Sequence, residues 1–235
     1  RLGQPQQEVE LLGENHTLIR IKAGIPYKIP EIVAIEPDAS AASYFLSLPL
    51  VVGGSVTVQG LYSSSLQGDY KYTEVLKDLG MTIEETNSGT QASIPIKELP
   101  GSGVNRNFWP ISDTFLTLAA VSPLLKGATR IDGISHTRHQ ESDRISAMAN
   151  ELIKLGQWVE DGEDFLEIQP GLMVPSEVMT YEDHRVAMSF GILGCFNRFN
   201  IYIHLEKISF LYFTAVIVLI VCHQIRPAQI GTDLF

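Results

Sequence analysis

The densest cluster of side chains that could do chemistry runs from Arg138 to Arg144 and reads Arg-His-Gln-Glu-Ser-Asp-Arg. If helical geometry begins by Arg138, then Arg138, Glu141 and Arg144 lie three residues apart on one face. A carboxyl group held between guanidinium groups suits acid/base chemistry on an anionic substrate, because arginine binds carboxylate and phosphate groups through paired hydrogen bonds. The alternative is an exposed ladder of ion pairs worth about 0 to 1 kcal/mol each.

Two further acidic positions could belong to the same chemistry. Asp183, His184 and Arg185 form a charged opening to an apolar segment. They could contribute to a site, or Asp183 could cap a helix while His184 and Arg185 face solvent. Asp113 likewise begins an apolar segment, where a capping role is the default.

An internal repeat indicates the elements that must position these residues. The segment 38–61 aligns with 111–134 at a constant offset, with glycines and apolar residues in matching places. Each copy begins with an apolar helical segment, at 40–52 and 112–125, and continues into a strand of alternating character.

The second half of each copy is also repeated. An amphipathic helix ends at Gly80 in one copy and Gly156 in the other, and two strands follow it. The last strands are predicted at 91–96 and 165–169, and a third unit opens at Asp183. Long repeats with two different helices favour globular packing, so we expect an α/β or α+β domain.

Composition narrows the classes of protein. The 235 residues are 45% hydrophobic and carry a net charge of −10, which disfavours a broad nucleic-acid surface but allows a local basic pocket. Cys195 and Cys222 are too few for a disulfide framework, which favours a reducing compartment. The histidines His16, His136 and His204 lack metal-ligand spacing, and no metal is expected.

An apolar run at 208–222 is shorter than the roughly 20 residues that a membrane-spanning helix needs. A buried strand or helix is the preferred interpretation. Membrane anchoring through this run is a weaker alternative.

Taken together, these stretches resemble EPSP synthase over about 35–195. The segment 36–45 is similar to the family's acidic, small-residue helix start, and 65–69 to its Gln-Gly-Asp segment. The cluster ending at Arg144 is similar to the signature Arg-x-Lys-Glu-x-Asp-Arg, and 183–188 matches a second C-terminal motif.

The resemblance implies an inverse α/β barrel of repeated βαβαββ units. It also implies 3-phosphoshikimate 1-carboxyvinyltransferase activity, a step of aromatic amino acid biosynthesis: the enolpyruvyl group of phosphoenolpyruvate passes to the 5-hydroxyl of shikimate 3-phosphate, and phosphate is released. No metal or organic cofactor, nucleic acid or membrane is implied. The expected compartment is the cytoplasm, or the plastid if the source is a plant.

Site roles follow from the same resemblance. Asp113 would orient and deprotonate the hydroxyl, and Glu141 would move the proton on the methylene carbon. Arg144 and Arg185 would hold the carboxylate and phosphate of phosphoenolpyruvate, with His184 assisting. Gln140 takes a substrate-binding position at which the family commonly has Lys.

The resemblance also divides the chain. Residues 1–34 are interpreted as a remnant of a preceding unit or a linker, and 35–195 as a partial enolpyruvyl transferase domain. The tail 196–235 lacks the family's Lys-Thr-Phe-Pro segment, so we interpret it as atypical and out of frame or unspliced. The family's N-terminal half, with its Lys and Ser-Ser-Gln phosphate ligands, would be needed to complete the cleft. Two alternatives remain: a UDP-N-acetylglucosamine enolpyruvyl transferase, or a catalytically silent domain of the same fold.

Overall fold

The computed structural model describes residues 9–12, 18–21, 31–94, 101–195 and 202–204. The chain divides into two compact units, 1–35 and 36–235. In the first unit, β1 (Val9–Leu12) and β2 (Leu18–Ile21) pair antiparallel, with Val9 opposite Ile21. All residues discussed below belong to the second unit.

Three apolar helices form the core of the second unit: α1 (Ala39–Val52), α3 (Phe115–Val121) and α5 (His184–Leu193). Each contacts the other two. Every residue of α3 is buried, as expected of a helix that is apolar all round. Where α1 meets α3, the hydroxyls of Ser43 and Thr117 form a buried hydrogen bond of 2.8 Å.

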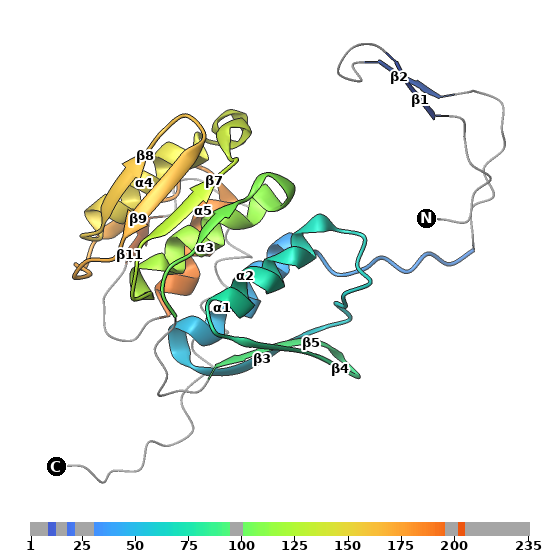
Figure 1. The fold of residues 1–235 in the computed structure, drawn as a ribbon, viewed down its shortest axis with the longest axis horizontal. Coiled ribbons are helices and arrows are strands. Elements are labelled where there is room, and N and C mark those ends of the chain that lie inside the picture. Colours follow the sequence, from blue (N-terminus) through green and yellow to red (C-terminus); the bar gives the residue numbers. More distant parts are fainter. Residues whose placement is uncertain (1–8, 13–17, 22–30, 95–100, 196–201, 205–235) are drawn as a thin grey trace, which may run out of the picture. The chain divides into compact units, whose positions relative to one another are not determined.

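Two sheets and two amphipathic helices lie around this core. The three-stranded sheet has the antiparallel order β3-β5-β4, and in the four-stranded sheet, of order β6-β7-β9-β8, β6 runs parallel to β7 while the other pairs are antiparallel. Figure 1 shows α1 and α2 along the first sheet, and α4 contacts β8 and β9 of the second. The bounds are β3 (Gly54–Gln59), α2 (Tyr72–Asp78), β4 (Thr82–Thr86), β5 (Gly89–Ile94), β6 (Asn105–Asn107), β7 (Thr129–Asp132), α4 (Arg144–Lys154), β8 (Trp158–Asp161) and β9 (Phe165–Gln169).

The predicted order of helix, strand, helix, strand and strand occurs from α1 to β5 and again from α3 to β9. Gly80 and Gly156 follow α2 and α4 with φ of 87° and 85°, a left-handed conformation in which glycine avoids the usual steric cost. The predicted strand at 91–96 ends at Ile94, and the next two residues lie outside the described part. The superposition of the two copies as structural repeats stays a prediction.

The predicted continuous helix over 112–125 is wrong. The structure has a 3-10 turn η3 (Trp109–Thr114), then α3, then a second 3-10 turn η4 (Ser122–Leu124). Pro123 explains the end of α3, because proline has no N–H to continue the helical hydrogen bonds. The short turn before α3 places Asp113 outside the helix proper.

The C-terminal end contains two short strands, β10 (Glu177–Met179) and β11 (Tyr202–His204), which pair in parallel. Apart from β11, the tail 196–235 lies outside the described residues, and so does the apolar run at 208–222. Within the described ranges, none of the helices has the length and apolarity needed to cross a bilayer.

Candidate active site

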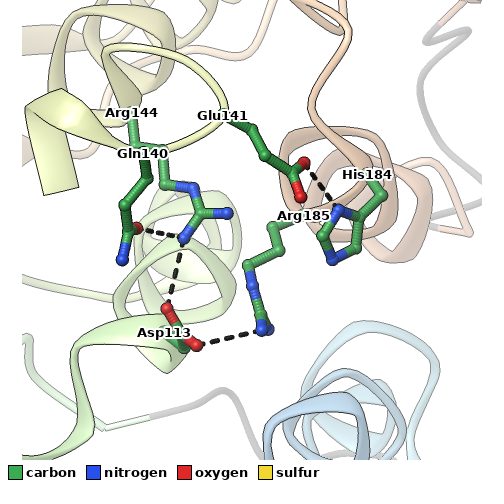
Figure 2. Close-up of a pocket in the computed structure, with 6 residues that line it drawn as sticks. All are labelled: Asp113, Gln140, Glu141, Arg144, His184 and Arg185. Atoms are coloured by element: carbon green, nitrogen blue, oxygen red, sulfur yellow. Dashed lines mark hydrogen bonds and ion pairs between the residues drawn. The ribbon is translucent and has the colours of Figure 1, made fainter.

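Six side chains line one open pocket of about 300 Å³, and all six were singled out from the sequence. Figure 2 shows them converging from three directions. They are Asp113, Gln140, Glu141, Arg144, His184 and Arg185. Each lies at or just before the N-terminus of α3, α4 or α5. Helix N-termini carry partial positive charge and unpaired N–H groups, so this convergence favours an anionic ligand.

A buried ion pair joins the lining residue Arg144 to Asp183. The Arg144 Nε lies 2.8 Å from Asp183 Oδ2, and the two side chains are 4% and 0% exposed. Ser142 donates to the same oxygen, and the Arg185 backbone N–H donates to the other. Burial alone raises the pKa of Asp183, but the donors, led by Arg144, outweigh it and hold the pKa below its ordinary value. Asp183 is therefore a fixed negative charge.

Asp113 lies between two guanidinium groups. Its Oδ1 is 3.2 Å from Arg144 Nη1, and its Oδ2 is 2.9 Å from Arg185 Nη2. The Gln140 side-chain oxygen also accepts a hydrogen bond from Arg144. The two arginines thus present positive charge to the pocket from either side of one carboxylate, an arrangement that could receive carboxylate or phosphate groups.

Glu141 and His184 form the exposed side of the pocket. His184 Nδ1 lies 2.7 Å from Glu141 Oε2, and the two side chains are 39% and 49% exposed. A carboxyl and an imidazole in direct contact can pass a proton between them and to a bound molecule. The structure therefore separates a buried charged pair from an accessible pair of acid/base groups.

The loop that carries Gln140 and Glu141 is held by Arg138. Its Nη1 donates to both oxygens of Asp143 at 2.9 and 2.8 Å, and its Nη2 donates to the Gly162 carbonyl at 2.6 Å. The predicted stripe of Arg138, Glu141 and Arg144 on one helical face is therefore wrong. Helix α4 begins only at Arg144, so the side chains before it point in other directions.

The capping alternatives have different outcomes. Asp183 does cap α5, since its side chain accepts from the Arg185 backbone, but the same carboxylate also holds Arg144. Asp113 lies within η3, and its two oxygens contact arginines. Asp113 therefore pairs with two arginines that are distant in sequence, and within the described ranges the expected local capping role is not seen.

Sequence reasoning missed Tyr44 of α1, which is buried beside the site. Burial raises the pKa of Tyr44 to about 12, while the Arg185 and Arg144 guanidinium groups oppose that rise. Its hydroxyl makes no well-formed hydrogen bond within the described part of the chain. The sequence does show a tyrosine inside an otherwise apolar, small-residue helical segment. Because a buried tyrosine hydroxyl needs a hydrogen-bond partner, this pattern could have marked Tyr44 as a candidate.

Glu141, Asp183 and His184 also carry ligand atoms within 4.8 Å of one another, a spacing that could hold a metal ion. Both Asp183 oxygens are already engaged by Arg144, Ser142 and the Arg185 backbone. Two guanidinium groups in the same pocket oppose a cation. The pocket as a whole, with its two arginines, is thus better suited to an anion than to a cation.

Comparison with known proteins gives a consistent result. A family model described as EPSP synthase (3-phosphoshikimate 1-carboxyvinyltransferase) matches residues 8–213, which extends beyond both ends of the resemblance seen at 35–195. The 3-phosphoshikimate 1-carboxyvinyltransferase of Opitutus terrae is 48% identical over 187 residues, covering 76% of this chain and 38% of that protein. That of Nostoc punctiforme is 41% identical over 187 residues, covering 80% and 42%.

Solved structures agree on the fold. EPSP synthase from Acinetobacter baumannii matches with a TM-score of 0.58 and 25% identity, over 68% of this chain and 40% of that one. The enolpyruvyl transferase NikO from Streptomyces tendae matches with a TM-score of 0.53 and 16% identity, over 73% and 38%, which supports the mixed α/β fold alone. The chain spans about 40% of the length of these relatives.

Proposed function

The chain belongs to the EPSP synthase family, and on that premise we propose that its pocket is one wall of a site for carboxyvinyl transfer. The reaction transfers the enolpyruvyl group of phosphoenolpyruvate to the 5-hydroxyl of shikimate 3-phosphate and releases phosphate. The observation that carries the proposal is the grouping of two carboxylates, two arginines and a histidine at three helix N-termini. Both substrates are anions, which the arginines and helix ends would attract.

The proposed roles follow the accessibility of each group. Asp113 takes the proton of the attacking hydroxyl, while Glu141 gives a proton to the methylene carbon of phosphoenolpyruvate. The new C–O bond completes a tetrahedral intermediate. Glu141 then removes a proton from the resulting methyl group as the C–O bond to phosphate breaks, and Asp113 gives its proton to the departing phosphate. His184, in contact with Glu141, supports these proton transfers.

The arginines bind and orient the small substrate. Arg144 and Arg185 hold its carboxylate and phosphate, so Asp113 must share or yield some of its arginine contacts when phosphoenolpyruvate enters. Within the described residues, no hydrogen bond is made by Arg144 Nη2, so this donor is available to a ligand. Binding would therefore rearrange existing contacts and also add new ones.

Further parts of the proposal concern the whole enzyme. This chain corresponds to the C-terminal portion, folded as part of an inverse α/β barrel, and a matching N-terminal half supplies the opposite wall. One relative, from Brassica napus, is described as chloroplastic, so a plastid location belongs to the proposal only for a plant source.

The test is phosphate release from shikimate 3-phosphate and phosphoenolpyruvate by the chain alone and mixed with an N-terminal half from a close relative. We expect turnover only in the mixture. Asp113→Asn and Glu141→Gln should each lower kcat by about 10²- to 10⁴-fold, the range typical of a lost general acid or base. Glu163→Gln, at an exposed glutamate outside the pocket, is the matched control. Equal rates in all variants would refute the proposal.

Gln140 gives a second test of the same proposal. If this position contacts shikimate 3-phosphate, Gln140→Lys would add a positive charge and lower the KM for that substrate. The control substrate is phosphoenolpyruvate, whose KM should change less. No turnover in any mixture, with substrate binding also absent, would instead favour the catalytically silent domain.

A further inference from the structure

Tyr181 and Glu182, which directly precede the site residues of α5, have an unusual backbone. Their φ angles are 55° and 56°, and in the described part of the chain they are the only non-glycine residues with positive φ. Each such residue costs about 1–3 kcal/mol, so the conformation persists only where its surroundings hold it in place. The next residue is Asp183, whose N–H donates to the Thr180 carbonyl at 2.9 Å and closes the turn.

This left-handed turn determines where the site residues point. Asp183 immediately follows it, caps α5 and pairs with Arg144. His184 and Arg185 are the first two residues of α5 and face the pocket (Figure 2). A relaxed, right-handed backbone at Glu182 would change the direction in which the chain enters α5. The strained backbone therefore lies at the point in the chain that sets the direction of Asp183, His184 and Arg185.

A buried carboxylate holds the turn from behind. Glu151 of α4 is fully buried, and its oxygens accept from the Tyr181 hydroxyl at 2.6 Å and the Met179 backbone N–H at 3.1 Å. Lys154 lies 2.7 Å away and supplies the compensating charge that a buried carboxylate needs. Burial, together with the Glu151 carboxylate, raises the pKa of Tyr181 to about 12, so its hydroxyl remains a proton donor at neutral pH.

We propose that Glu151 is a positioning residue that acts through Tyr181 to hold the left-handed turn, and thereby aims His184 and Arg185 into the pocket and Asp183 at Arg144. Glu151 touches neither the pocket nor any of its six lining residues by a hydrogen bond or ion pair. It contacts strand β10 through Met179 and the turn through Tyr181, so it fixes the turn relative to α4. Because α4 also begins with Arg144, one helix carries both a site arginine and the anchor of the opposite site segment.

The test uses the full chain with Tyr181→Phe, which removes the donor but keeps the ring. Tyr62→Phe is the matched control, because it also removes a tyrosine hydroxyl, one that donates to the Asn87 carbonyl and contacts neither Glu151 nor the turn. The first readout is the imidazole NMR signals of His184, assigned with His184→Gln. We expect Tyr181→Phe to shift them and Tyr62→Phe to leave them in place, whatever each variant does to the melting temperature.

Rescue provides the second readout. Glycine adopts positive φ without steric cost, so adding Glu182→Gly to Tyr181→Phe should restore the His184 signals. In the mixture with the N-terminal half, Tyr181→Phe should raise the KM for phosphoenolpyruvate about tenfold, the scale of losing one hydrogen bond to a charged group, and the double variant should recover it. This kinetic readout rests on the proposed function, whereas the NMR readout does not.

The outcomes separate the two proposals. Shifted and rescued His184 signals without turnover in any protein would support the positioning role and count against the proposed function. Unshifted His184 signals in Tyr181→Phe, with only a lower melting temperature, would overturn the positioning role even if the wild-type mixture is active.

Discussion

The site has a buried half, the Arg144–Asp183 pair, and an exposed half, the Glu141–His184 pair. The two halves differ in how their charges are stabilised. Arg144 and Asp183 are almost fully buried, so each charge needs the other to offset its lost hydration. Glu141 and His184 are half-exposed, and water offsets most of their mutual attraction. The buried pair therefore fixes the geometry of the site, and losing either partner would cost much of the free energy of unfolding. The exposed pair adds little stability but can reach solvent and a bound molecule to exchange protons.

The largest effect on stability should come from breaking the buried half. Arg144→Met leaves the Asp183 carboxylate buried without its main partner, and the free energy of unfolding should fall by about 3–5 kcal/mol. Denaturant unfolding of the full chain measures this. Arg106→Met is the control, because Arg106 pairs with Glu74 and Asp78 on the surface and should cost about 0–1 kcal/mol. Equal losses in the two variants would contradict the comparison.

Acid should remove the stability that the Asp183 carboxylate contributes, within a defined pH range. The pKa of Asp183 lies below its ordinary value of 3.8 in the folded state, so the unfolded chain binds its proton more readily. The stabilisation is complete well above pH 3.8 and is lost as the pH falls through the unfolded and then the folded pKa. Asp183→Asn should therefore lose stability at neutral pH and show a smaller further loss than wild type below about pH 4. If the stability of wild type and of Asp183→Asn fell in parallel with pH, Asp183 would contribute no pH-dependent stability.

The left-handed turn before Asp183 should become more stable when its backbone strain is relieved. Glu182→Gly should raise the free energy of unfolding by about 0.5–1 kcal/mol, because the steric cost of positive φ exceeds the extra chain entropy that glycine loses on folding. Glu163→Gly, at a residue without positive φ, should instead destabilise. Thermal unfolding of both variants distinguishes the signs.

The smallest effect on stability should come from the exposed half. His184→Gln should change the free energy of unfolding by less than about 1 kcal/mol, because the Glu141 contact is solvated. A loss as large as that of Arg144→Met would mean that the two halves are not different in kind.

The family resemblance predicted which residues share a site, but not how they pair. Asp113, Glu141, Arg144 and Arg185 all line one pocket, while the roles that the resemblance implies for them stay a prediction. The Arg144–Asp183 pair joins residues 39 positions apart, and local spacing carries no information about such a contact. The predicted stripe from Arg138 failed because it assumed helix before Asp143, the residue that caps α4.

The anchor behind the site left a trace in the sequence that could have been used. Glu151 follows Met148 by three residues and precedes Leu155 by four, which places a carboxylate on the apolar face of α4. A charge on such a face is rare unless it is paired. Its partners, Tyr181 and the Met179 backbone, come from a distant segment, so only the fold could identify them.

The measurement that most directly tests the division of the pocket is deuterium entry into the methylene group of phosphoenolpyruvate. The full chain, mixed with a matching N-terminal half and shikimate 3-phosphate in D₂O, should incorporate deuterium as Glu141 adds and removes protons at that carbon. Glu141→Gln should lower the incorporation rate at least about 100-fold while the melting temperature stays close to wild type. Undiminished incorporation in that variant would contradict the assignment of proton transfer to the exposed half.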